Sequence, residues 1–276
     1  MTGKVLGGNP PTSRTPPRLL VSVRNPDEAR AAVAGGAAII DAKDPLAGAL
    51  GPVTSRTLAE IRYAVPRAVP LSAALGDAPD HRAIRALIAG LEPGTMAFGK
   101  VGFAGCSESQ GAEAVRAAVD ALGETRLVLV AYADWQSVSA LSPESVTDLA
   151  VRTGATGVLL DTAGKGSGTL LQLWSVEQIT EFATRGRAAG LLVALGGSLA
   201  LADISIAVST GADIIGVRGA ACVGGRNGSV DRERVSALRA AVAQAGSVSR
   251  IHSPIEARPS GPVIRSAIPA GSTRVK

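Results

Sequence analysis

The sequence predicts an α/β protein built as one (β/α)8 TIM barrel. Short apolar segments alternate eight times with helix-like segments along the 276 residues, which is typical of parallel strands joined by helices. The apolar segments lack polar alternation, which indicates strands that are covered on both faces. A pattern of helix end, glycine, alanine and buried strand recurs at 34–41, 153–161 and 210–215. Eight such units close into a barrel.

Capping residues and glycine turns mark the first four strand–helix units. Asn25 is expected to cap the first helix, with Pro26 in its first turn and Gly35-Gly36 at its end. The expected strands of this half are 19–23, 38–41, 70–74 and 96–101, and the expected helices after the first are 55–64, 79–89 and 107–121.

The second half of the chain repeats the unit four more times. Ser142 and Pro143 begin the fifth helix as a cap and a first-turn proline. The other expected helices of this half are 175–188, 199–209 and 230–244, and the expected strands are 126–131, 156–161, 191–195 and 213–217.

Both ends of the chain lack the periodicity of a folded segment. Residues 1–17 are rich in glycine, proline, threonine and arginine, and residues 247–276 are rich in serine, proline and arginine. We therefore expect a disordered leader over 1–17, a single catalytic domain over 18–246 and a disordered tail over 247–276.

The composition favours a protein that binds small anions. The formal net charge is +5, but the basic residues are not clustered and only 3% of the residues are aromatic. These features favour anionic metabolites over nucleic acid, which needs basic patches and stacking aromatics. The first apolar run, Leu19–Val23, is too short for a signal peptide or a membrane span. Cys106 and Cys222 lie far apart without metal-ligand spacing, so we expect a reduced cytoplasmic setting and no metal. We also expect no cofactor. The sequence leaves a homo-oligomer open.

Lysine is scarce, and its positions are selective. Only five of the 28 basic residues are lysines, and three of them, Lys43, Lys100 and Lys165, lie inside the predicted barrel. Where a generic cation serves, this sequence uses arginine. A lysine can lose its proton and attack a carbonyl group, whereas an arginine cannot. The three internal lysines are therefore the first candidates for catalysis.

The predicted strand ends gather these lysines with carboxylates, and catalytic groups of such barrels lie at the C-terminal strand ends. Asp41 and Lys43 are two residues apart and point to one face of the second strand. Alternate strands contribute to one layer, so Lys100, Lys165 and Arg218 are expected to converge there with Lys43. Packed cations disfavour each other's protonation, which predicts a lowered lysine pKa, while carboxylates offset the charge and move protons. The carboxylates proposed for this role are Asp41 and Asp161.

Two glycine turns after strands seven and eight suit a phosphorylated substrate. Such barrels often bind phosphate there through backbone N–H groups. The residues that we expect to bind the substrate or its phosphate are Ser22, Asp77, Gly197, Ser198, Arg218 and Gly219. The segment 224–228, Gly-Gly-Arg-Asn-Gly, is either a second anion-binding loop or a plain tight turn.

In combination, these motifs resemble the (5-formylfuran-3-yl)methyl phosphate synthase family over residues 19–238. The resemblance is carried by Leu20-Val21-Ser22-Val23, by the segments 36–45, 48–51, 71–77 and 99–102, by Leu160-Asp161-Thr162-Ala163 with Lys165, and by 216–222. That family is a (β/α)8 barrel that condenses two molecules of glyceraldehyde 3-phosphate into a furan aldehyde phosphate, the furan precursor of methanofuran-type cofactors.

The resemblance also implies roles for individual residues. Lys43 would form a Schiff base with the substrate, Lys100 would accept a proton, and Asp161 and Lys165 match a further active-site pair. The scarce surface lysines, the leader and the long tail differ from compact members of the family, and they suggest a bacterial version that serves a methylofuran-like cofactor.

Three other functions remain open from the residues. A phosphate-binding decarboxylase or epimerase barrel has an Asp-x-Lys-x-x-Asp motif that begins like Asp41-Ala42-Lys43, but its third acid would fall at Leu46. A class I aldolase acting on another sugar phosphate would use the same Schiff-base lysine. A barrel that binds a phosphometabolite without catalysis is the third, although the retention of all three lysines speaks against it.

Overall fold

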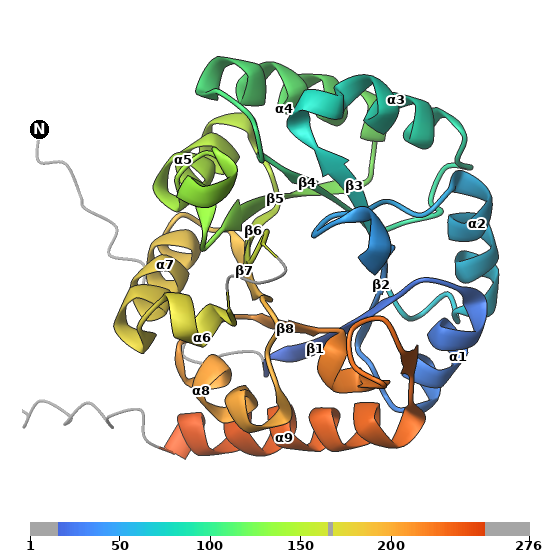
Figure 1. Ribbon diagram of the computed structural model, residues 1–276, viewed down its shortest axis with the longest axis vertical. Coiled ribbons are helices and arrows are strands. Elements are labelled where there is room, and N and C mark those ends of the chain that lie inside the picture. The colour runs from blue at the N-terminus through green and yellow to red at the C-terminus, as the bar shows by residue number, and fades with distance from the viewer. Residues whose placement is uncertain (1–15, 165–167, 252–276) are drawn as a thin grey trace, which may run out of the picture.

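The computed structural model describes residues 16–164 and 168–251, and it confirms the closed (β/α)8 barrel (Figure 1). The strands of the barrel are β1 (Arg18–Val23), β2 (Ile39–Ala42), β3 (Leu71–Asp77), β4 (Phe98–Gly102), β5 (Arg126–Tyr132), β6 (Gly157–Asp161), β7 (Leu192–Leu195) and β8 (Ile214–Val217). Every neighbouring pair is parallel, and β1 pairs with both β2 and β8, which closes the sheet. The strand ends that the sequence singled out therefore meet at one end of the barrel.

Helices surround this barrel in Figure 1. Those of the described residues are α1 (Pro26–Ala34), α2 (Ser55–Ala64), α3 (His81–Ala89), α4 (Glu108–Leu122), α5 (Pro143–Thr153), α6 (Leu170–Leu173), α7 (Val176–Ala188), α8 (Ile204–Ser209) and α9 (Arg232–Ile251). Short 3-10 helices are η1 (Pro45–Ala47), η2 (Ala78–Asp80), η3 (Trp135–Val138), η4 (Leu201–Asp203) and η5 (Gly219–Ala221). The sequence did not predict α6, because its four residues are too few to show a helical period.

The predicted helix starts are confirmed by their hydrogen bonds. The side chain of Asn25 accepts from the backbone N–H of Glu28, 2.9 Å away, and so caps α1. Ser142 caps α5 in the same way, and capping boxes begin α4 at Ser107 and α7 at Ser175.

The last helix runs further than predicted. It was expected over 230–244, but α9 extends to Ile251, so residues 247–251, assigned to the disordered tail, are helical. The physical reason is tertiary packing beyond the predicted end, because Ala245 packs against the hydrophobic core and Gly246 is buried beside Pro17. The predicted disorder of 1–15 and 252–276 lies outside the described residues.

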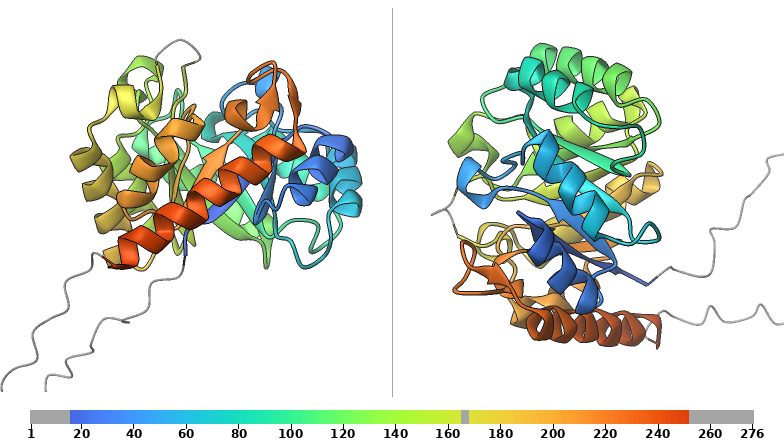
Figure 2. Two further views of the ribbon diagram at one scale, coloured as in Figure 1. Left: turned by 90° about the horizontal axis from the view of Figure 1, so that it is seen from below. Right: turned by 90° about the vertical axis from the view of Figure 1, so that its right-hand side faces the viewer.

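A small hairpin follows η5 where the sequence left an anion loop or a tight turn open. Its antiparallel strands are β9 (Cys222–Val223) and β10 (Ser229–Val230), so residues 224–228 form the hairpin tip. In Figure 2 the orange hairpin projects from the barrel near the start of α9. The tip of the hairpin is the part of the segment between η5 and α9 that contacts neighbouring loops at the strand ends.

Alternate residues of each strand face two apolar layers. On β2, Ile40 and Ala42 belong to the large cluster between strands and helices, whereas Ile39 belongs to a second cluster inside the barrel. Because side chains alternate along a strand, Asp41 and Lys43 share the inward face with Ile39. The fold thereby directs both residues into the barrel.

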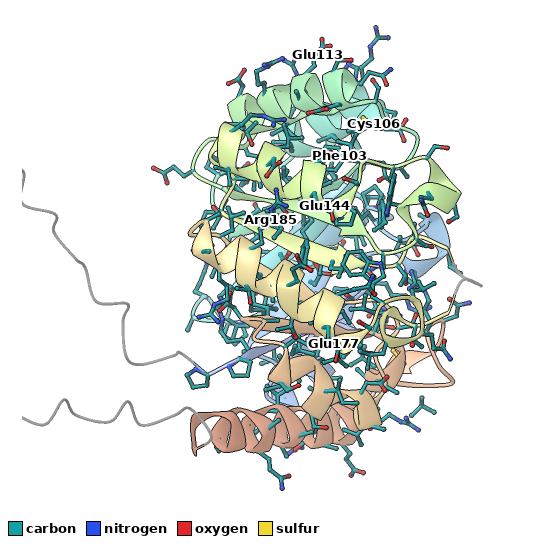
Figure 3. The ribbon with its side chains drawn as sticks, turned by 90° about the vertical axis from the view of Figure 1, so that its left-hand side faces the viewer. Phe103, Cys106, Glu113, Glu144, Glu177 and Arg185 are labelled. Carbon is teal, nitrogen blue, oxygen red and sulfur yellow. The ribbon has the colours of Figure 1, made fainter. Side chains whose placement is uncertain are left out.

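The outer layer of helices carries charged side chains toward solvent. Glu113, Glu144 and Glu177 mark α4, α5 and α7, which lie side by side over the strands in Figure 3. Arg185 of α7 pairs with Asp148 of α5 at 2.7 Å on this surface. Across residues 16–164 and 168–251, none of the helices combines the length and apolarity needed to cross a membrane.

Candidate active site

A cavity of about 550 Å³ extends from the barrel interior to the loops after β7 and β8 and to α9. Its polar and charged wall is formed by Ser22, Lys43, Ser72, Lys100, Asp161, Ser198, Arg218, Arg226 and Arg234. Apolar side chains line the inner part of the cavity. Each lies on a barrel strand, two residues before one of these polar groups: Leu20, Phe98 and Leu159. The cavity therefore has an apolar floor and a charged upper wall at the C-terminal strand ends.

Asp41 is the buried centre of the first charged group. Its side chain has no exposed surface, and its Oδ2 atom accepts from Lys100 Nζ at 2.7 Å and from Ser22 Oγ at 2.8 Å. The strand register sets this arrangement, because Ser22 on β1 lies beside Asp41 on β2. The second carboxylate oxygen, Oδ1, has no hydrogen-bond partner within the described residues. Asp41 thus holds a cation on one oxygen and keeps acceptor capacity on the other.

Lys43 forms the second charged group with Asp161. The two side chains come from β6 and the end of β2, and Lys43 Nζ lies 3.6 Å from Asp161 Oδ2. Burial lowers the pKa of Lys43 below 10.5, and the positive charge of Lys100 adds to this, while Asp161 acts in the opposite direction. The direction agrees with the sequence prediction, but desolvation rather than charge repulsion is the main cause.

The predicted convergence of lysines and carboxylates is seen for Asp41, Lys43, Lys100 and Asp161, whereas Lys165 lies outside the described residues. Their catalytic roles stay predictions. No group of three or more His, Cys, Asp or Glu side chains within 16–164 and 168–251 is arranged to hold a metal ion.

Asp134 secures the backbone that follows β6. Its carboxylate accepts from the N–H groups of Ala163 and Gly164, at 2.8 and 2.7 Å. Asp134 itself lies two residues after the end of β5, so it ties two neighbouring strand ends together. This contact fixes the loop beside Asp161 as it leaves the barrel.

Arg218 was expected to bind phosphate, but its guanidinium is fully engaged by the protein. It is buried and bonds to Glu28 of α1 through both terminal nitrogens, at 2.9 and 3.3 Å. The other bonds go to the carbonyl oxygens of Ser22, Arg226 and Gly228. A guanidinium has five N–H donors, and all five are used here. This pairing corrects the prediction: Arg218 builds the wall of the cavity and offers no N–H group to a phosphate.

Asp77 also differs from its predicted role. It lies outside the cavity wall, where Oδ1 accepts from Tyr132 Oη at 2.9 Å and from the backbone N–H of Ala104 at 3.0 Å. Burial raises the pKa of Asp77, against the opposing effect of these two donors. Asp77 therefore joins β3 to β4 and β5, and the structure gives it no contact with the cavity.

The glycine turns after β7 and β8 do line the cavity. Gly197, Ser198 and Gly219 all contribute to its wall. Ser198 has a φ of 58°, a left-handed conformation that is uncommon outside glycine. The backbone N–H groups of Gly197 and Ser198 donate to no acceptor within the described residues. This turn has the free donors that an anion site needs.

Arg226 is a cavity residue whose side chain the sequence did not single out. It lies at the hairpin tip, in the glycine-rich segment that was a candidate anion loop. One terminal nitrogen donates to the carbonyl oxygen of Gly48 at 3.1 Å, while the buried Nε has no partner among the described residues. The signal in the sequence was an arginine within the glycine-rich segment 224–228, but the direction of its side chain depends on the hairpin.

Solved structures with the same fold support the barrel architecture. A phosphoribosyl anthranilate isomerase from Thermotoga maritima aligns with a TM-score of 0.55 at 13% identity, covering 83% of this chain and 98% of that one. A thiamine phosphate pyrophosphorylase from Pyrococcus furiosus aligns with a TM-score of 0.53 at 15% identity, covering 82% and 95%. At such low identity, these likenesses show the fold alone.

Sequence relatives define the family. The sequence model of 4-HFC-P synthase matches residues 19–239. The (5-formylfuran-3-yl)methyl phosphate synthase of Methanopyrus kandleri is 40% identical over 235 residues, which cover 82% of this chain and 99% of that protein. The enzyme of the same name from Methanocaldococcus jannaschii is 38% identical, covering 80% and 97%. The chain therefore belongs to the (5-formylfuran-3-yl)methyl phosphate synthase family, as its motifs indicated.

Proposed function

We propose that this protein condenses two molecules of glyceraldehyde 3-phosphate into (5-formylfuran-3-yl)methyl phosphate, with loss of phosphate and water, through a Schiff base on Lys43. The product would be the furan precursor of a methanofuran-type cofactor, and the enzyme would be a carbon–oxygen lyase acting on phosphates. The observation that carries the proposal is the buried Lys43, whose pKa is lowered and which lies 3.6 Å from Asp161. Family membership supports the choice of reaction.

The chemistry begins with the free amine of Lys43. Burial leaves a larger neutral fraction of this lysine, and a neutral amine can attack the carbonyl carbon of a triose phosphate. Loss of water gives an iminium, which makes the adjacent C–H acidic. Removing that proton gives an enamine, which can expel phosphate from C3 and leave an unsaturated iminium. The enol of the second triose can then add at C3 through its own C2, and ring closure with loss of water yields the aromatic furan. Asp161, beside Lys43, is the group that can move protons during imine formation.

The pair of Lys100 and Asp41 is proposed to handle the proton on carbon. Lys100 Nζ lies in the cavity wall, 2.7 Å from Asp41 Oδ2, so a proton taken up by the lysine can be shared with the carboxylate. Ser22 Oγ bonds to the same oxygen at 2.8 Å and keeps Asp41 in position. Lys165 remains a candidate by resemblance, outside the described residues.

The phosphate that stays in the product is proposed to bind the turn after β7. The N–H groups of Gly197 and Ser198 have no acceptor within the described residues, and both residues line the cavity. Gly219 lines the same wall from the β8 side. Backbone N–H groups at these two loops are the usual phosphate donors of such barrels.

Borohydride trapping tests the proposal directly. The protein is incubated with glyceraldehyde 3-phosphate, reduced and analysed by peptide mass spectrometry, and a furan product is sought by ultraviolet absorption in an unreduced sample. A triose adduct on the peptide containing Lys43, together with a furan, is expected. Lys43→Arg is the matched control, because it keeps the charge and cannot form the covalent bond.

Each outcome separates the alternatives. An adduct on Lys43 without a furan would indicate an ordinary class I aldolase. An active enzyme that gives no adduct would overturn the Schiff base. A protein that binds the triose phosphate but gives neither adduct nor furan would be a binding barrel.

A further inference from the structure

We infer that Arg226 binds the phosphate group that the reaction eliminates and stabilises the negative charge as this group leaves. The inference rests on the proposed function and extends it to a second anion subsite, separate from the turn at Gly197 and Ser198. Two phosphorylated substrates require two such places, because one phosphate is retained and the other departs. The hairpin of β9 and β10 supplies the second one.

The charges in the cavity wall leave Arg226 without an acidic partner. Lys43 lies beside Asp161 and Lys100 beside Asp41, while Arg218 is paired with Glu28. Within residues 16–164 and 168–251, no carboxylate lies within ion-pair distance of the guanidinium of Arg226, which lines the cavity, and its buried Nε lacks any hydrogen-bond partner. Arg234 also lines the cavity and has no ion pair with another described residue, but it is an exposed residue of α9. An anion in the cavity would satisfy the buried donor of Arg226.

The hairpin holds this guanidinium in a fixed place. The carbonyl oxygen of Arg226 accepts from Arg218 Nε at 2.9 Å, and that of Asn227 accepts from Arg24 at 3.0 Å. The side chain of Arg226 is tied to the loop after β2 by its bond to the Gly48 carbonyl. Gly219, in the turn after β8, packs beside the Arg226 backbone, where an added Cβ would lie 3.6 Å from its nitrogen. Several strand-end loops thus orient one unpaired donor.

Arg226 and Lys43 line the same cavity. The positive charge of Arg226 is one of the causes that lower the pKa of Lys43, so the two groups interact electrostatically across the cavity. A triose phosphate joined to Lys43 through its aldehyde carbon has its phosphate ester five covalent bonds from Nζ. The departing phosphate therefore lies close to Lys43, inside the cavity that Arg226 also lines.

The elimination step needs no oxidant or further reactant. A proton leaves C2 of the imine-bound triose and passes to the Lys100–Asp41 pair, which gives the enamine. The enamine electrons then form a C2–C3 double bond and restore the iminium as the C3–O bond breaks. The electron pair of that bond leaves with inorganic phosphate, whose developing charge a guanidinium stabilises through two parallel N–H bonds.

The test compares Arg226→Gln with Arg24→Gln. Both variants remove one arginine that contacts the hairpin or its neighbouring loop, but Arg24 does not line the cavity. Imine formation is measured by borohydride trapping with glyceraldehyde, which has no phosphate, and with glyceraldehyde 3-phosphate. Phosphate release and furan formation are followed in parallel, and binding of inorganic phosphate to the resting protein is measured by calorimetry.

For Arg226→Gln we expect a normal adduct with glyceraldehyde, phosphate release slowed about 100-fold, as for other lost charge-stabilising donors, and inorganic phosphate bound at least about tenfold more weakly. Arg226→Lys should recover part of both losses, and Arg24→Gln should resemble the wild type. An equal loss of both adducts would mean a structural role and would overturn the inference, as would unchanged phosphate binding in Arg226→Gln. If the wild type makes no furan although its phosphate binding depends on Arg226, the anion subsite stands and the proposed reaction fails.

Discussion

At the scale of single residues, a lysine can serve this barrel as a nucleophile where an arginine cannot, and it can do so because its side chain is buried. Lys43 and Lys100 are 6% and 4% exposed, in a protein whose surface cations are nearly all arginine. A buried ammonium loses hydration, and desolvation is the largest cause of the lowered pKa of Lys43. An exposed lysine at the same strand end would stay protonated near neutral pH.

The lowered pKa of Lys43 predicts a dependence of stability on pH. Between its folded-state pKa and the unfolded value of 10.5, the unfolded chain binds more protons, so this group makes the folded state more stable as pH rises through that window. Lys43→Met removes the titration. Chemical unfolding of both proteins at a series of pH values should show the free-energy difference moving in favour of the wild type as pH increases. A difference that is constant with pH would contradict the assignment.

Lys100 is predicted to act as a base rather than as a fixed cation. Lys100→Arg preserves a positive charge for Asp41 but cannot give up its proton. We expect kcat to fall by about 100-fold or more, while the borohydride adduct on Lys43 still forms. Steady-state kinetics and trapping on the same preparation check this, and near-normal turnover would mean that Lys100 serves only as a cation.

At the scale of elements, a buried ion pair joins the last strand to the first helix. Arg218 follows β8 and Glu28 belongs to α1, and each side chain is 3% exposed. Arg24 also bonds to Glu28, at 2.8 Å, so two arginines share one carboxylate. The same Arg218 bonds to the hairpin backbone, so closing the barrel also positions the hairpin.

Breaking this pair should affect folding more than substrate binding. Arg218→Gln leaves Glu28 with Arg24 as its remaining partner and takes a donor from three carbonyl oxygens, so we expect about 3 kcal/mol of destabilisation. The matched control is Arg30→Gln on α1, because Arg30 pairs with Asp27 on the exposed surface and its loss should cost at most about 1 kcal/mol. Urea unfolding measures both. Equal effects would show that the Arg218 pair is no more important than a surface contact.

At the scale of the whole molecule, the pairing of β1 with β8 closes the barrel. The helix α9 packs against α8, α1 and β1, so it covers the seam where the two ends of the sheet meet. In Figure 1 α9 lies along the outside of β8 and β1. The described residues thus contain β1 and β8, which close the sheet, and α9, which covers their junction.

A chain of residues 16–251 should therefore fold by itself. We expect a single unfolding transition with a midpoint within a few degrees of the full chain, and an unchanged rate of imine formation with glyceraldehyde. Calorimetry and trapping measure the two properties. The matched truncation 16–231 lacks α9 and should unfold at a clearly lower temperature, since it exposes the residues that Val235 and Leu238 cover. A large loss of stability in 16–251 would show that the domain boundary is wrong.

Local signals in the sequence predicted most of the fold. Asparagine, serine and proline at helix starts act within one turn, so Asn25 and Ser142 were recognised from neighbouring residues alone. The strands were recognised from continuous apolar runs, and their number implied closure. The alternation of strand side chains put Asp41 and Lys43 on one face, which the structure confirms. The length of α9 was missed because its packing against the barrel, rather than its composition, carries it to Ile251.

The sequence by itself thus determined the barrel, the family and the meeting of Lys43 and Lys100 with Asp41 and Asp161. Only the tertiary structure decided which charges are paired and which are left for a ligand. Arg218 meets Glu28 across 190 residues, and Arg226 points into the cavity because a hairpin turns it there. Such pairings depend on distances of a few ångströms between separate loops. No periodicity along a single segment encodes those distances, because they arise only when the barrel closes.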